Sequence, residues 1–178
     1  MNQSDRQVRD QVNVVGHSYG RGMYNMESSE YTLVEVCAGA GGQSLGLHKA
    51  GFNHSLAVEI DPTAAETLVN NLRVPIAIGD VAERGVWDPQ DHAGVTLFAG
   101  GVPCPPFSTA GKQLGSSDER DLFAWAIEQV AVMQPRAVML ENVRGLASAR
   151  FAPYRQRVID RLHELGYVGE WKLLHSAD

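Results

Sequence analysis

The chain has 178 residues, 44% of them hydrophobic and 20% charged, which suits a single globular domain with its own core. Its formal net charge of -6 argues against a protein that binds nucleic acid unaided, because such binding rests largely on Lys and Arg meeting phosphates. No apolar run has membrane-spanning length and no signal peptide is visible, so we expect a cytoplasmic protein whose two cysteines are free thiols and hold no metal.

Residues 1–29 are polar and lack an apolar period, so we expect a disordered or loosely attached tail before one domain at 30–178. From Tyr31, short apolar runs alternate with helical patterns. The predicted strands are 32–36, 55–60, 75–80, 94–100, 136–142 and 167–174, and the predicted helices are 43–50, 62–72, 119–133 and 153–165. Such alternation predicts an α/β fold with a mostly parallel sheet and helices on both faces.

Residues able to bind a ligand or react with one follow most of these strands at the carboxyl end, where open α/β sheets bind ligands. They are Glu35 with the glycine loop at 37–42, then Glu59 and Asp61, Asp80, Cys104, and Glu141 with Asn142. Glu59 lies 20 residues after Gly39, the distance at which an acid commonly holds ribose hydroxyls, and Asp80 could accept from an adenine amino group. The loop has no phosphate motif and Glu35 would repel an anion. The pattern therefore favours a nucleoside without phosphates, carrying a positive charge.

The segment "GGVPCPPFS" places Cys104 between prolines. Pro103, Pro105 and Pro106 exclude a helix or a central strand, so we expect a stiff loop that presents the thiol. A thiolate is a strong nucleophile, and a buried structural cysteine would not need this setting. The histidines show no constellation, and Trp87 and Trp125 are interpreted as packing residues.

The motifs "EVCAGAGGQSLGLHKAGF", "VEID", "GD", "GGVPCPPFS" and "ENVRG", in this order, resemble those of cytosine-5 DNA methyltransferases, from Tyr31 to the end of the chain. The resemblance implies a Rossmann-like fold that binds S-adenosylmethionine and transfers its methyl group to C5 of a flipped-out cytosine through a covalent cysteine adduct. It implies that Cys104 is the nucleophile, that Glu141 binds the base and that Asn142 holds the loop or Glu141.

The same resemblance implies the other site residues. The cofactor would be bound by Cys37, Ala38, Gly39, Gly41, Gly42, Glu59, Ile60, Asp80, Val81, Gly101 and Pro103. Cys37 stands where an aromatic residue is frequent in the family, and we interpret it as a packing residue. The loop from Ser108 to Arg120 would close over DNA with Lys112 at a phosphate and Arg144 nearby, although an ordinary surface loop is an equal alternative.

Family members continue beyond "LLHSAD" with a Gln-x-Arg-x-Arg element, a target-recognition domain and a segment that completes the cofactor pocket. We therefore expect a fold incomplete at its C-terminus, in a fragment, a truncated gene product or one subunit of a split enzyme whose second chain recognises the target. The sheet edge near Trp171 should then be open and apolar. The alternatives are RNA as the substrate, or a non-catalytic remnant that binds S-adenosylmethionine or a partner protein.

Overall fold

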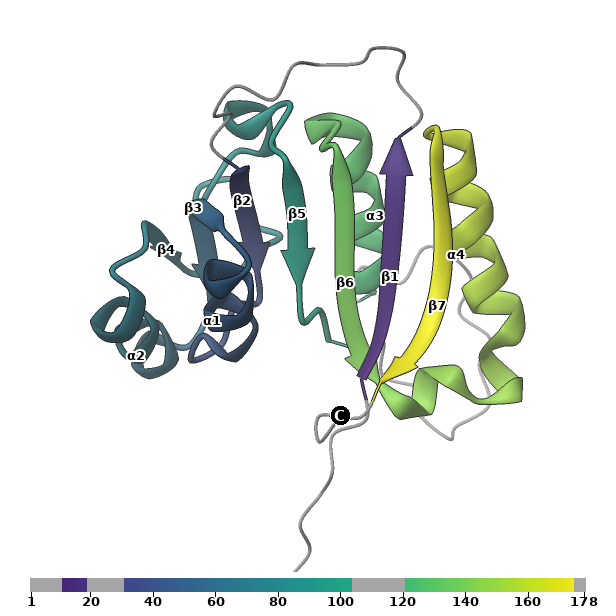
Figure 1. Cartoon of the computed structure of the whole chain (residues 1–178), viewed down its shortest axis with the longest axis horizontal. Coiled ribbons are helices and arrows are strands. Elements are labelled where there is room, and N and C mark those ends of the chain that lie inside the picture. The colour runs from purple at the N-terminus through teal and green to yellow at the C-terminus, as the bar shows by residue number, and fades with distance from the viewer. Residues whose placement is uncertain (1–10, 19–30, 104–120, 175–178) are drawn as a thin grey trace, which may run out of the picture.

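The computed structural model describes residues 11–18, 31–103 and 121–174. These residues form a seven-stranded sheet in the order β4-β3-β2-β5-β6-β1-β7 (Figure 1). The strands are β1 (Gln11–Ser18), β2 (Tyr31–Val36), β3 (Phe52–Glu59), β4 (Ile76–Ile78), β5 (Leu97–Gly100), β6 (Ala137–Val143) and β7 (Tyr167–Leu174). The helices are α1 (Gly42–Lys49), α2 (Pro62–Leu72), α3 (Leu122–Met133) and α4 (Ala152–Glu164), with short 3₁₀ turns η1 (Pro89–His92), η2 (Arg144–Ala147) and η3 (Ala149–Phe151).

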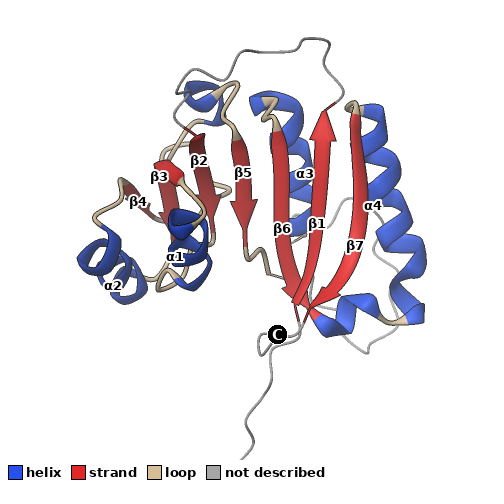
Figure 2. Ribbon diagram, in the orientation of Figure 1, coloured by secondary structure: helices blue, strands red, loops and turns tan. Residues whose placement is uncertain are grey.

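The predicted mostly parallel, Rossmann-like sheet is confirmed. The ladders from β4 through β3, β2 and β5 to β6 are all parallel. Figure 2 shows α1 and α2 on one face of the sheet, with α3 and α4 on the other. Parallel neighbours bring their carboxyl ends to one edge of the sheet, which is the lower edge in Figure 1. Among the described residues, no helix has both the length and the apolar character to cross a membrane.

The larger hydrophobic cluster lies between the sheet and the α3–α4 layer. Phe98 on β5 packs there with Phe123 and Ile127 from α3 and Leu162 from α4, all at most 2% exposed. Two smaller clusters lie under α1 and α2 on the opposite face. The sheet is thus covered on both faces, and its strands can be apolar on both sides.

The helix starts follow ordinary capping chemistry. Asp61 caps α2, accepting from the amides of Thr63 and Ala64, and Pro62 takes the first helical position as predicted. Asp121 caps α3 and also accepts from the Tyr154 hydroxyl at 2.8 Å, which joins α3 to α4. These caps fix where each helix leaves the carboxyl edge of the sheet.

The expectation of a loosely attached tail is wrong for residues 11–18. They form β1, which lies between β6 and β7 and pairs antiparallel with both. The ladder runs over Gln11–His17 against β6 and over Gln11–Ser18 against β7. The remainder of the predicted tail, at 1–10 and 19–29, lies outside the described residues. An interior strand cannot be an appendage, because its backbone groups bond on both sides.

β7 forms one edge of the described sheet, where an open strand was expected. Val168 and Leu173 are 52% and 43% exposed along it. Trp171, expected on the apolar edge, instead stacks on Phe123 of α3 with ring centroids 5.9 Å apart. The edge is therefore apolar in part, and its largest side chain belongs to the core.

Candidate cofactor and active site

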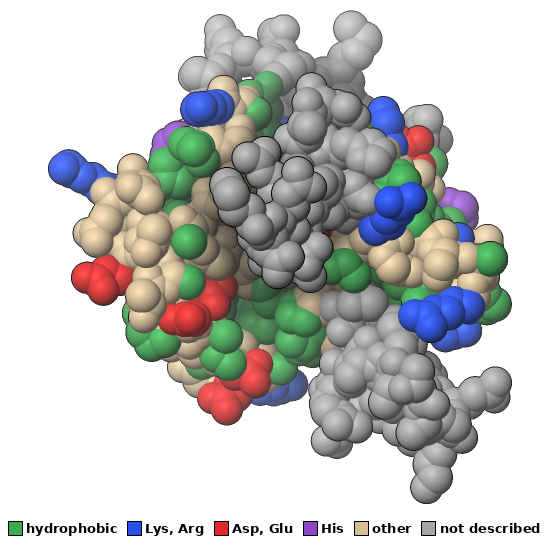
Figure 3. All heavy atoms as spheres, turned by 90° about the horizontal axis from the view of Figure 1, so that it is seen from below, with side chains coloured by type: hydrophobic (Ala, Val, Ile, Leu, Met, Phe, Trp, Pro, Cys, Tyr) green, Lys and Arg blue, Asp and Glu red, His purple; other side chains and the backbone are tan. Residues whose placement is uncertain are grey.

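A cavity of about 310 Å³ opens at the carboxyl ends of the central parallel strands. Its lining includes Cys37, Glu59, Ile60, Asp80, Val81, Gly101 and Pro103, all of them predicted cofactor residues, together with Val58, Gly79 and Leu122. Residues at the ends of four strands, β2, β3, β4 and β5, thus meet the first residue of α3, because these strands end at the same edge of the sheet. Figure 3 shows this face, with most of the visible acidic side chains on the left and Lys and Arg side chains on both sides.

Sequence reasoning missed three lining residues. Val58 and Gly79 directly precede Glu59 and Asp80, so the strand-end signal reaches them. Leu122 begins α3 and lies within the predicted helix 119–133, whose pattern did not indicate its contact with the cavity. Only the packing of α3 against the strand ends shows that Leu122 closes one side of the cavity.

The remaining predicted loop residues shape the cavity without lining it. Ala38 is 7% exposed and packs against Ala57 and Leu68. Gly41 has φ 94°, and an added Cβ would lie 2.6 Å from Leu68 Cδ1, so only glycine fits this turn into α1. Gly42 begins α1. These residues bring the loop close to α2 and set its path.

Glu59 is the most strongly held side chain of the site. It is 8% exposed, and its Oε2 accepts from the Gly39 amide at 2.7 Å while Oε1 accepts from the Asp61 amide at 2.9 Å. Each carboxylate oxygen has a second lone pair available to a ligand hydroxyl. Glu59 therefore anchors the glycine loop and presents acceptors to the cavity at once.

The cavity is electrically negative. Glu59 and Asp80 both line it, and none of the lining residues that the structure describes is basic. Burial, followed by the charges of Glu59 and Asp80, raises the pKa of the Cys37 thiol to about 12. The thiol is thus neutral at physiological pH and cannot act as a nucleophile there. This agrees with the interpretation of Cys37 as a packing residue, now in the wall of the cavity.

Gly100 and Gly101 join the cavity to the strand that carries Glu141. A Cβ on Gly100 would lie 2.5 Å from the Val36 carbonyl oxygen, so β5 and β2 can approach here only with glycine. A Cβ on Gly101 would lie 3.2 Å from Glu141 Oε2. Gly101 lines the cavity, so the Glu141 carboxylate lies close to a residue of the cavity wall.

Asn142 connects β6 to the start of the Pro-Cys loop. It is 2% exposed, its Nδ2 donates to the Val102 carbonyl at 2.8 Å, and its Oδ1 accepts from the Val143 amide at 2.9 Å. Val102 lies two residues before Cys104. The side chain of Asn142 therefore holds the backbone from which the loop departs.

Several predicted residues lie outside the described part of the chain, namely Cys104, Ser108, Lys112 and Arg120. Pro103, the last described residue before them, lines the cavity. Arg144 is exposed at the beginning of η2, directly after β6. The described structure thus brings Glu141, Asn142 and the cofactor residues together, and the placement of the thiol and of the DNA loop stays a prediction.

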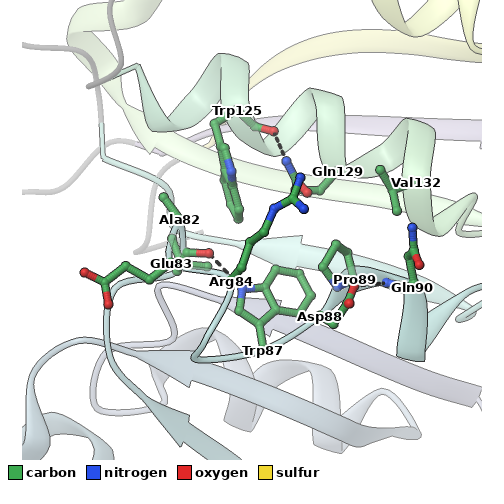
Figure 4. Close-up of a pocket in the computed structure, with 11 residues that line it drawn as sticks. Ala82, Glu83, Arg84, Trp87, Asp88, Pro89, Gln90, Trp125, Gln129 and Val132 are labelled. Atoms are coloured by element: carbon green, nitrogen blue, oxygen red, sulfur yellow. Dashed lines mark hydrogen bonds between the residues drawn. The ribbon is translucent and has the colours of Figure 1, made fainter.

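A second hollow of about 280 Å³ adjoins the first and shares Val81 with it. Figure 4 shows Trp87 and Trp125 on its walls with Arg84 reaching between them. The Trp87 indole donates to the Val81 carbonyl at 2.8 Å, and the two Trp rings meet edge to face at 6.3 Å. Both tryptophans thus support the Val81 wall by packing, as their sequence positions suggested.

The sequence agrees with this geometry when it is compared with known proteins. Residues 31–178 match the sequence model of C-5 cytosine-specific DNA methylases. The chain belongs to the C-5 cytosine-specific DNA methylase family. It is 64% identical over 154 residues to the type II methyltransferase M.NaeI of Lentzea aerocolonigenes, and 50% identical over 150 residues to M.NgoMIV of Neisseria gonorrhoeae. These alignments cover 86% and 84% of this chain but only 37% and 47% of the two relatives.

Solved structures show the same fold at lower sequence identity. A Spodoptera frugiperda DNMT2 variant aligns with a TM-score of 0.58 and 23% identity, covering 76% of this chain and 41% of that protein. The Dnmt2 methyltransferase of S. pombe aligns with a TM-score of 0.52 and 21% identity, covering 73% and 41%. The cavity at the strand ends therefore lies in a methyltransferase fold.

Proposed function

We propose that the chain carries the cofactor site and the reacting residues of a DNA cytosine-5 methyltransferase. The observation that carries this proposal is the position of Gly101, which lines the negative cavity and at which an added Cβ would lie 3.2 Å from Glu141 Oε2. A methyl donor in the cavity and a base held by Glu141 would then be neighbours. Holding two reactants in contact removes much of the barrier of a bimolecular reaction.

The described residues fit S-adenosylmethionine, which supplies the methyl group when it is bound. Glu59 offers free lone pairs to ribose hydroxyls, and Asp80 lies on the wall of the same cavity as an acceptor for an amino group. A sulfonium ion is positively charged, and two carboxylates in a wall whose described residues include no basic side chain stabilise such a ligand. The same lining disfavours a phosphate-bearing nucleotide.

The reacting base would be activated by residues of this chain. The Cys104 thiolate adds to C6 of cytosine, which makes C5 nucleophilic toward the methyl group. Loss of the C5 proton and expulsion of the thiolate then restore the aromatic ring and the free enzyme. Glu141, in its protonated form, donates to N3 and draws charge from C6. Asn142 positions the loop through the Val102 carbonyl.

We propose DNA as the substrate because the family and the relatives named above are DNA methyltransferases. The chain spans less than half the length of these relatives. We therefore expect activity to require the remaining length of such a protein, on the same polypeptide or on a second chain that recognises the target sequence.

Trapping with 5-fluorocytosine tests this proposal, because fluorine at C5 cannot leave as a proton does and the adduct persists. The chain is mixed with the separately expressed remainder of a relative such as M.NaeI, with S-adenosylmethionine and with DNA or RNA containing 5-fluorocytosine. We expect a denaturation-resistant complex with DNA. A complex with RNA alone would overturn the assignment of the substrate.

The matched control is Cys104→Ser, which keeps the size of the side chain and removes the nucleophile. We expect it to abolish the adduct and to leave S-adenosylmethionine binding, measured by calorimetry, unchanged. An adduct that survives this substitution would place the nucleophile elsewhere in the protein.

A further inference from the structure

Three polar side chains meet in the core beneath the glycine loop. Oε2 of Glu35 on β2 accepts from the Ser44 hydroxyl of α1 at 2.7 Å and lies 2.7 Å from Nε2 of His54 on β3. Glu35 and Ser44 are 0% exposed and His54 is 9% exposed. With hydrogen on Nε2, His54 donates the second bond to the same oxygen. We call these residues the Glu35 cluster.

The backbone of β3 is irregular where His54 joins the cluster. The β2–β3 pairing shifts between Leu33 and Val34, so that Leu33 pairs with His54 and Val34 with Leu56. The extra residue, Ser55, donates through its hydroxyl to the Leu33 carbonyl at 3.1 Å. A bulge of this kind redirects a side chain, and here it places His54 on the same face of the sheet as Glu35.

The Glu35 cluster is less favourable in free energy than apolar packing of the same part of the core would be. Glu35 Oε1 and His54 Nδ1 are buried and have no hydrogen-bond partner among the described residues. A buried carboxylate is unfavourable unless hydrogen bonds compensate it, and an apolar side chain would pack here without that cost. The contacts are confined to β2, β3 and the first turn of α1. β2 and α1 flank the glycine loop, and β3 pairs with β2 beside it.

The Ser44–Glu35 bond spans the loop. Glu35 lies two residues before Cys37, and Ser44 lies two residues after Gly42. Between them Cys37, Gly39 and Gly41 all have positive φ, at 53°, 56° and 94°. Glycine adopts such angles readily, but Cys37 has a side chain, so surrounding contacts must impose its left-handed conformation.

We infer that the Glu35 cluster positions the glycine loop for the cofactor, so that cofactor affinity depends on three residues that do not line the cavity. This inference rests on the proposed function. Glu59 fixes the middle of the loop through the Gly39 amide, and the cluster fixes its two ends. When the loop is already ordered before the cofactor binds, binding costs less conformational entropy of the loop.

The test is Ser44→Ala in the full chain, because alanine is a better helix former than serine and the helix itself should survive. We expect the Kd for S-adenosylmethionine, measured by calorimetry, to rise roughly tenfold, as for the loss of one hydrogen bond to a charged group. Without the cofactor, the backbone amides of residues 37–42 should exchange with deuterium faster than in the wild type.

The matched control is Thr96→Val. Thr96 bonds through its hydroxyl to the Thr32 amide at 3.2 Å, at the opposite end of β2, so its loss weakens the same strand away from the loop. We expect this variant to lose stability while the Kd and the exchange of residues 37–42 stay as in the wild type.

The outcomes separate this inference from the proposed function. If the wild type binds and Ser44→Ala changes neither the Kd nor the exchange of the loop, the inference is wrong and the cofactor site stands. If the wild type binds no S-adenosylmethionine, the proposed function fails. Loop exchange then decides whether the cluster orders the loop. An effect of Thr96→Val as large as that of Ser44→Ala would also refute the inference.

Discussion

Neighbouring glycines at the end of β5 should respond very differently to alanine. In Gly100→Ala, the new Cβ would lie 2.5 Å from the Val36 carbonyl oxygen and 2.7 Å from Val36 Cγ2, in a strand paired on both sides. Backbone in the middle of a sheet cannot move away, so we expect a loss of about 3 kcal/mol, at the upper end of ordinary overpacking. For a chain of 178 residues this lowers Tm by about 6–12 °C.

Gly101→Ala should leave the fold nearly unchanged. Its nearest contact is Glu141 Oε2 at 3.2 Å, the end of a flexible side chain that can shift by a few tenths of an ångström. We expect a loss of stability below about 1 kcal/mol. The displaced carboxylate is the one proposed to bind the base, so formation of the 5-fluorocytosine adduct should slow roughly tenfold.

Thermal unfolding of the two variants and of the wild type, followed by circular dichroism, measures the first effect. Rates of adduct formation with the complementary protein supplied measure the second. Equal destabilisation by both substitutions would contradict the packing described at Gly100. A stable Gly101→Ala protein that forms the adduct at the wild-type rate would show that Glu141 does not lie against the cavity wall at Gly101.

Three further results follow from the described contacts. In a Cys104→Ala background, Cys37 should resist iodoacetamide at pH 7–9 and react only near pH 11 or after unfolding. The reason is that the raised pKa of about 12 keeps most of the thiol protonated at lower pH. Rapid labelling of the folded protein at pH 8, seen by mass spectrometry, would contradict this. Deletion of residues 1–18 should lower Tm by more than 10 °C or give insoluble protein, because it removes the interior strand β1, while deletion of 1–10 should not. Equal stability of the two deletion variants would show that residues 11–18 do not form a strand of the sheet. Asn142→Asp, which sets an oxygen against the carbonyl two residues before Cys104, should cost about 1–3 kcal/mol in urea unfolding, and an unchanged midpoint would argue against that bond.

Much of the candidate site could be predicted from the order of strands and helices in the sequence alone. Acids and glycines at the ends of predicted parallel strands must meet at one edge, whatever the details of packing. Glu59, Asp80 and Gly101 were placed in one cavity by this reasoning, and the structure brings them together there. The signal is strong because each strand is a short apolar run that ends at a recognisable turn.

Glu35 shows where that reasoning fails. It stands near the end of a strand like the other acids and was expected beside the ligand, but it is fully buried under α1 and bonded to Ser44 and His54. Alternation along β2 puts it on the face covered by α1, and the bulge at Ser55 supplies its partner. A bulge shifts the register by one residue, and sequence periodicity does not reveal it.

The sequence by itself determined the α/β class and the family, and it predicted most of the residues that line the cavity. These depend on local apolar runs, turn residues and motifs that stand close together in the chain. The tertiary structure alone decided that 11–18 is an interior strand, since its partners β6 and β7 lie more than a hundred residues away and the segment has no apolar period of its own. Only the tertiary structure shows that Glu141 lies near Gly101 of the cavity wall and that Leu122 forms part of this wall. Contacts between distant segments depend on how the layers pack, and that packing is a property of the whole sheet and its helices.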